Sequence, residues 1–143
     1  MENADSPLCE ARSSERETLI QLPLGLLGFE HIKSYSLASK PDEAPFKWLQ
    51  APGDDTLAFL VVNPFEVLPD YQPEISNDDV AFLRLPSPEE AIILSIVTLR
   101  PGNRATVNLK GPVVLNRKDL RGKQVILANA AKYALQHPLP TAE

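Results

Sequence analysis

The sequence predicts a mainly β protein of one domain, an antiparallel barrel-like or sandwich fold with one short helix. Its 143 residues suit a single domain, and the 43% that are hydrophobic are enough to form a core. Fourteen prolines, spread from Pro7 to Pro140, leave few windows for an uninterrupted helix. Short apolar or alternating runs separated by turn signals recur along the chain, as is typical of antiparallel β proteins.

The N-terminal third begins with charged and small residues, and we expect 1–16 to be a mobile tail before a folded domain of residues 17–138. A second tail, 139–143, follows that domain. Strands are expected at 18–22, 32–39 and 46–50. Between the first two, Gly25 and Gly28 indicate a turn with positive φ or a close backbone approach. The apolar residues of this loop are expected against the core, namely Leu24, Leu26, Leu27 and Phe29.

The stretch Thr56–Tyr71 changes character halfway. Leu57–Val62 is an apolar run of strand length, and Asn63-Pro64 ends it because proline has no N–H for a ladder. Aromatic and apolar side chains then alternate with acidic ones and prolines. This segment is too broken by proline to be regular core, so we look for function there.

A short helix is expected at 76–83, where Ser76 or Asn77 can cap the first turn. Asp78 and Asp79 suit the positive end of the helix dipole. Adjacent helical residues point in different directions, which disfavours a metal site made by this pair.

The last third contains the strongest strand patterns. Ala91–Leu99 is a nearly continuous apolar run, typical of a strand covered on both faces. Pro101-Gly102-Asn103 then turns the chain into the alternating residues 104–110, which completes a predicted antiparallel hairpin. Further strands are expected at 113–115 and 123–128.

Charge is distributed unevenly along the chain, whose net charge is −5. Residues 41–90 carry two basic and eleven acidic side chains, a net charge of −9, whereas residues 91–143 carry eight basic and two acidic ones, +6. An acidic middle repels phosphates and suits a basic protein partner, unless it is simply a solvated surface.

The residue inventory argues against an enzyme and against a cofactor or metal ion. Cys9 is the only cysteine, and the two histidines, His31 and His137, have no metal-ligand spacing. No serine lies in a nucleophile elbow, although a pair of buried carboxylates stays open as a hydrolase hypothesis. Without a long apolar stretch or a secretory signal, the chain is predicted to be cytoplasmic and not in a membrane.

By elimination, the broken segment is the candidate surface for a protein partner, with aromatic rings and an acidic rim. An alternative interpretation is that the segment is a lid that buries the rings of Phe65 and Tyr71 against the barrel. A second class of function is RNA binding by the basic last third, through Arg104, Lys110, Arg117, Lys118, Arg121 and Lys123. The predicted partner-binding residues are Asn63, Phe65, Glu66, Asp70, Tyr71 and Glu74.

Several segments taken together resemble the FliW family of bacterial flagellar assembly factors. They are LPLGLLGFE (22–30), PFKWLQ (45–50), LAFLVVNPFEVLPDY (57–71), ILSIVTL with RATVNLKGPVVLN (93–116), GKQVIL (122–127) and the Tyr133–Pro138 ending. The resemblance implies a compact antiparallel β-barrel-like fold that binds proteins, with no cofactor and no direct contact with nucleic acid. The implied partners are flagellin and the translational repressor CsrA, which the family antagonises.

Two segments depart from the family pattern. The usual Gly-Glu-Ile-like first strand is replaced by Cys9–Ser13, which lacks apolar alternation, and the usual Gly-Leu-Pro-Gly-Phe is here Gly25–Phe29, with leucine in place of proline. We therefore expect the first strand to be frayed or replaced.

Overall fold

The structure is a computed structural model that describes residues 16–39, 41–43, 45–53, 57–102 and 104–139. It confirms the mainly β, antiparallel fold. The predicted N-terminal tail, Cys9–Ser13 included, lies outside the described residues except Arg16, the first residue of β1. The strands are β1 (Arg16–Gln21), β2 (Ser34–Ser39), β3 (Lys47–Gln50), β4 (Ala58–Val62), β5 (Ala91–Arg100), β6 (Arg104–Val107), β7 (Val113–Asn116), β8 (Gly122–Gln124) and β9 (His137–Pro138).

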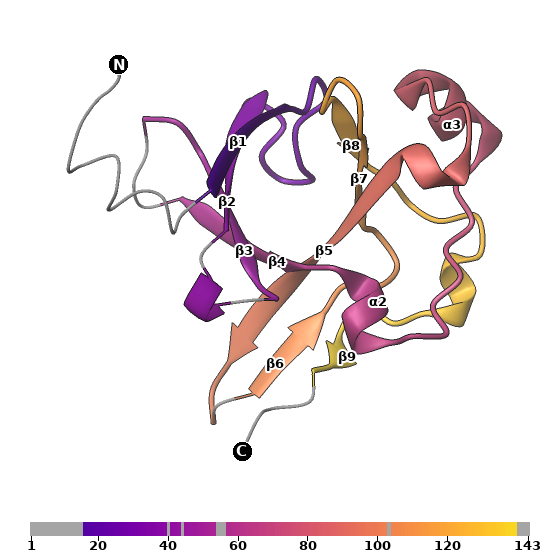
Figure 1. The fold of residues 1–143 in the computed structure, drawn as a ribbon. Helices are drawn as coiled ribbons and strands as arrows, with labels where there is room; N and C mark the ends of the chain where they lie inside the picture. The colour runs from indigo at the N-terminus through magenta and orange to yellow at the C-terminus, as the bar shows by residue number, and fades with distance from the viewer. Residues whose placement is uncertain (1–15, 40, 44, 54–56, 103, 140–143) are drawn as a thin grey trace.

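Seven of these strands form the wall of a partly open barrel, which Figure 1 shows as a ring of β1, β2, β3, β4, β5, β7 and β8. Each neighbouring pair along this order is antiparallel. Between the ends of the series, an isolated parallel bridge joins Gln21 to Arg121, which immediately precedes β8. The barrel is therefore not closed by a continuous ladder between β1 and β8.

Strand β5 is central because it takes part in three ladders. Its first four residues pair with β7, and its later residues pair with β4 and β6. Ten residues of extended chain span about 33 Å, which is long enough for all three. Beyond β6, the two-residue β9 extends the sheet. This strand was not predicted, since its sequence carries no apolar alternation.

Two groups of buried side chains form the core. One fills the barrel and includes Ile20, Tyr35 and Leu49, while the other lies outside β5 and β7 and includes Tyr71, Leu83 and Leu109. Because β7 alternates between the two groups, all four of its residues are buried. In β5, residues 91–97 are likewise buried or half-buried on both faces, as predicted, whereas Thr98 and Leu99 at its end are exposed.

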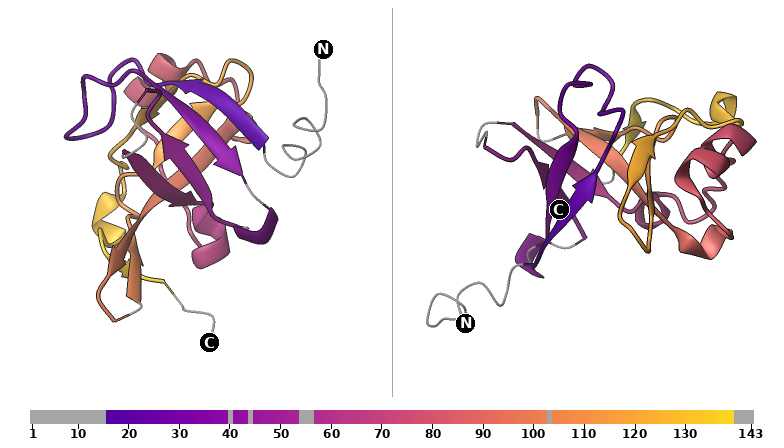
Figure 2. Two further views of the ribbon diagram at one scale, coloured as in Figure 1. Left: turned by 90° about the vertical axis from the view of Figure 1, so that its left-hand side faces the viewer. Right: turned by 90° about the horizontal axis from the view of Figure 1, so that it is seen from above.

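The helical segments are α2 (Pro64–Val67), α3 (Asn77–Leu83) and the short 3-10 turns η1 (Pro41–Glu43), η2 (Pro88–Glu90) and η3 (Ala130–Lys132). Of these, α2, α3 and η3 contribute side chains to the second core group. Both views in Figures 1 and 2 place α3 and η3 on the side of β5 and β7 away from β1 and β2. No helix in the described ranges is both long and apolar enough to cross a membrane.

Helix α3 is the predicted helix, and Ser76 caps it by accepting a hydrogen bond from the Asp79 backbone at 3.2 Å. The single turn α2 was not predicted. The largest differences from the predicted strands are at two C-terminal ends: β6 ends at Val107 instead of residue 110, and β8 ends at Gln124 instead of residue 128. The Asn108 side chain explains the first difference, because its Oδ1 accepts from the Lys110 and Gly111 backbones and turns the chain.

The loop between β1 and β2 has the predicted glycine conformations. Gly25 and Gly28 have φ angles of 69° and 87°, in the left-handed region. Only part of the predicted apolar packing is present. Leu26 is buried, whereas Leu24 and Leu27 are exposed, because the loop turns back on itself through the Phe29 N–H to Leu26 carbonyl hydrogen bond.

Candidate functional site

The candidate segment begins with a helical turn at the end of β4. Asn63 caps α2, its Oδ1 accepting from the Phe65 N–H at 2.9 Å, and Pro64 occupies the first helical position, where it needs no donor. The Asn63-Pro64 pair, which ends the strand, therefore also begins a helix. The turn presents Phe65, with 40% of its surface exposed, and Glu66 to solvent.

Tyr71 lies on the inner side of this segment. Only 2% of its surface is exposed, and its hydroxyl donates to the Leu109 carbonyl at 2.7 Å. Its ring packs edge-on against Phe65 and Tyr133, with centroid distances of 5.6 and 4.7 Å. Burial, with a further contribution from Tyr133, raises the pKa of the Tyr71 phenol well above its ordinary value. In this conformation a partner cannot touch Tyr71 directly, whereas it can reach Phe65.

The chain after Tyr71 is fastened to the C-terminal segment. The Gln72 N–H donates to the Tyr133 hydroxyl at 2.9 Å. The Asn129 side chain holds the residues on both sides of Pro73: it donates to the Gln72 carbonyl at 2.8 Å and accepts from the Glu74 N–H at 3.0 Å. The Ala128 N–H completes the contact by donating to the Glu74 carbonyl at 2.7 Å. These bonds fix the backbone between α2 and α3.

The predicted site residues therefore fall into two groups. Tyr71 supports the segment from inside, as the lid interpretation expected for a buried ring. The others lie at the surface, namely Asn63, Phe65, Glu66, Asp70 and Glu74. The acidic side chains among them are presented by a backbone that is already ordered. We call residues 63–74 the acidic arm.

An apolar groove of about 710 Å³ lies beside the acidic arm. Asn63 and Phe65 form part of its lining, and Glu66, Asp70 and Glu74 do not. Lys47 and Arg117 are the charged residues that line it. The apolar lining includes Pro73, Ile75, Val80, Leu85, Ile92 and Ile93.

The groove was not predicted, because its lining comes from five separate parts of the chain: β3, the acidic arm, α3 with the turn after it, β5 and the turn after β7. No single stretch of sequence carries a pattern for such a surface. The one signal available was the isolated pair of prolines, Pro86 and Pro88, that separates α3 from β5.

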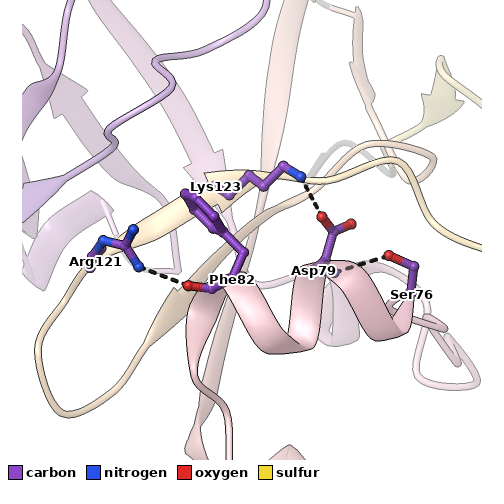
Figure 3. A network of polar contacts seen from close by, with 5 residues as sticks. All are labelled: Ser76, Asp79, Phe82, Arg121 and Lys123. Atoms are coloured by element: carbon purple, nitrogen blue, oxygen red, sulfur yellow. Dashed lines mark hydrogen bonds and ion pairs between the residues drawn. The ribbon is translucent and has the colours of Figure 1, made fainter.

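A network of polar contacts holds α3, one wall of the groove, against β8 (Figure 3). Lys123 forms an ion pair with the buried carboxylate of Asp79. Arg121 donates from Nη1 to the Phe82 carbonyl at 2.8 Å, and its guanidinium lies 4.4 Å from the centre of the Phe82 ring. Asp79 thus has a cationic partner in addition to its place in the first turn of α3.

The same network bears on the RNA-binding alternative. Two of the basic residues proposed for it, Arg121 and Lys123, are turned toward α3 and already engaged. The end of α3 is secured on the same side by Asn116, whose amide donates to the Leu83 and Arg84 carbonyls at 2.9 and 3.1 Å. Part of the basic turn is therefore structural.

Removing the Lys123 ammonium is expected to destabilise the fold. In Lys123→Ala the Asp79 carboxylate stays buried without its partner, and we expect the free energy of unfolding to fall by about 2 kcal/mol. Urea unfolding measures this change. Lys118→Ala is the matched control, because Lys118 is exposed in the same basic turn, and it should change stability by less than about 0.5 kcal/mol. Equal effects of the two variants would refute the role assigned to the pair.

Within the described ranges, no group of three or more histidine, cysteine, aspartate or glutamate residues is placed to hold a metal ion. Among the side chains that the structure describes, Asp79 is the one buried carboxylate, and it is paired with Lys123, so no two buried acids converge there in a pocket. The hydrolase hypothesis therefore has no support in this part of the chain.

The fold and the site define a small, partly open β-barrel with an acidic surface arm beside an apolar groove. Comparison with known proteins identifies the family of the chain. The family model described as FliW protein matches residues 6–139. The chain therefore belongs to the FliW family.

Individual relatives agree with this assignment. A flagellar assembly factor FliW of Leptospira biflexa is 40% identical over 114 residues, which cover 78% of this chain and 74% of the relative. Another, of Thermosipho africanus, is 34% identical over 134 residues, covering 92% and 91%. A crystal structure of the flagellar assembly factor FliW superposes with a TM-score of 0.76 at 28% identity, covering 87% of this chain and 88% of the other.

Proposed function

We propose that this chain is a cytoplasmic flagellar assembly factor that binds two protein partners, flagellin and the translational repressor CsrA, and that it is not an enzyme. When flagellin is scarce, the protein holds CsrA. When flagellin accumulates it occupies the protein, and the released CsrA represses flagellin synthesis until secretion lowers the flagellin level. Membership of the FliW family and similarity to flagellar assembly factors support the role in flagellar assembly.

The structural observation behind the proposal is the acidic arm. The backbone that carries its outward carboxylates, Glu66, Asp70 and Glu74, is held at both ends, by the Asn63 cap of α2 and by the contacts of Asn129 and Tyr133, so that little conformational entropy is lost when a partner docks. Negative charge attracts the basic surface that an RNA-binding repressor needs for phosphates, and it repels RNA from the bound repressor. The arm therefore suits CsrA as a partner and suits an antagonist of RNA binding.

The direct test mixes the purified protein with each partner. We expect a complex with flagellin and a complex with CsrA, each detected by size exclusion and titration calorimetry. Glu66→Lys with Asp70→Lys should weaken CsrA binding and reduce its dependence on salt, because both carboxylates face solvent. Absence of both complexes would reject the proposed function. Salt-sensitive RNA binding by the protein alone would support the alternative instead.

The exposed ring of Phe65 is expected to contribute binding energy. Phe65→Ala should weaken the complex with at least one partner by about 2 kcal/mol, roughly 30-fold in Kd, as for an aromatic residue at the centre of an interface. Calorimetry measures the change. Leu19→Ala is the control, since Leu19 is an exposed apolar residue of β1, across the ring from α2 in Figure 1. If both variants bind like the wild type, Phe65 is not part of an interface.

A further inference from the structure

The groove and the acidic arm differ in charge although they share α2. Of the residues that line the groove, the charged ones are both cationic, Lys47 and Arg117, and the rest are apolar or neutral. The arm beside it exposes Glu66, Asp70 and Glu74. A basic partner that is drawn to the arm is therefore repelled by the cations of the groove. The two surfaces suit partners of opposite character.

The groove is large enough for several side chains. Clefts that take small ligands measure roughly 300–1,000 Å³, and about 710 Å³ falls well inside this range. Its apolar lining, including Ile92 and Ile93 of β5, favours apolar groups. Val80 of α3 and Leu85 of the turn after it also line the groove, and the contacts of Asp79 and Asn116 hold these elements in place.

Both cations of the groove have nitrogens that can bind a carboxylate. Arg117 donates from Nε to the Glu89 carbonyl at 3.3 Å and from its backbone to the Glu90 carbonyl at 2.8 Å, which holds it at the end of η2. Within the described ranges, neither the Lys47 ammonium nor the terminal nitrogens of Arg117 have a hydrogen-bond or ion-pair partner. An acidic group on an apolar segment would provide one, with charge-assisted hydrogen bonds.

We propose that this groove binds an apolar segment of flagellin that carries a carboxylate, and that CsrA docks beside it on the outward carboxylates of the acidic arm, Glu66, Asp70 and Glu74, which do not line the groove. The inference rests on the proposed function. A filament subunit has to pack against identical subunits, so before assembly it exposes apolar surface that a groove can cover. An RNA-binding repressor instead displays a basic surface, which the groove cations disfavour.

The experiment compares both partners on variants of the groove. Lys47→Glu reverses one cation, and Ser87→Trp fills the groove from its lining without removing a side-chain hydrogen bond of Ser87. We expect each variant to weaken flagellin binding at least tenfold and to change CsrA binding by less than about threefold. Lys118→Glu, an equal charge change in the exposed turn, should leave flagellin binding within threefold of the wild type. Urea unfolding checks that each variant is folded.

The outcomes separate the two proposals. If the wild type binds flagellin and neither groove variant weakens the complex, the groove is not its site and only this inference fails. If Lys47→Glu and Lys118→Glu weaken it equally, the effect is one of net charge, and the inference also fails. If the wild type binds no flagellin, the proposed flagellin function fails and this inference fails with it. Should Ser87→Trp unfold, Lys47→Glu alone decides.

Discussion

Replacing Tyr71 with alanine is expected to lower the free energy of unfolding by about 4 kcal/mol. The substitution removes a ring that is 98% buried and packed against Phe65 and Tyr133, and such losses cost about 3–5 kcal/mol. It also leaves the buried Leu109 carbonyl without the phenol hydroxyl that donates to it at 2.7 Å. Urea unfolding followed by the fluorescence of Trp48 measures the loss.

Two further variants separate the contributions of Tyr71. Tyr71→Phe keeps the ring and removes the hydroxyl, so we expect a loss of about 1–2 kcal/mol. Phe65→Ala removes a partly exposed neighbour and should cost less than Tyr71→Ala. A Tyr71→Ala protein as stable as the wild type, with weaker partner binding, would mean that the ring leaves its buried position and meets the partner. The buried position of Tyr71 would then not be its functional one.

The inward direction of Tyr71 was beyond sequence analysis for a physical reason. In a strand or helix, spacing tells which side chains share a face, but Pro64 and Pro69 remove that periodicity from the acidic arm. What decides the direction is a carbonyl at Leu109, 38 residues away in the sequence. Both interpretations of the segment were therefore consistent with its composition. The structure buries Tyr71, as the lid interpretation expects, and leaves Phe65 partly exposed.

Elements that depend on neighbouring residues were predicted correctly from the sequence. The apolar run of β5 and its hairpin with β6 are present as predicted, and of the two residues predicted as a cap for α3, Ser76 is the one that caps it. The Lys123–Asp79 ion pair joins residues 44 apart, and the groove assembles residues from five parts of the chain. Such contacts depend on strand order, which residue patterns alone do not determine.

The loop that contains Gly25 and Gly28 shows which glycine properties a residue pattern predicts and which it does not. Two glycines three apart predicted positive φ, and both have it, but the sequence does not distinguish their surroundings. A Cβ at Gly25 would lie 2.6 Å from the Glu30 Cα and 2.7 Å from the Phe29 carbonyl oxygen, both backbone atoms. A Cβ at Gly28 would meet nothing within 4 Å. Only Gly25 combines the left-handed backbone with a close approach of two chain segments.

Gly25→Ala is therefore expected to lower the free energy of unfolding by about 3 kcal/mol, through left-handed strain of about 1–2 kcal/mol and a backbone clash. Relief of the clash would open the loop and withdraw Leu26 from the core. Gly28→Ala is the matched control in the same loop, and it should lose only the strain, about 1–2 kcal/mol. Urea unfolding of both variants gives the difference. Equal losses would show that conformation alone, without the close approach, requires glycine at position 25.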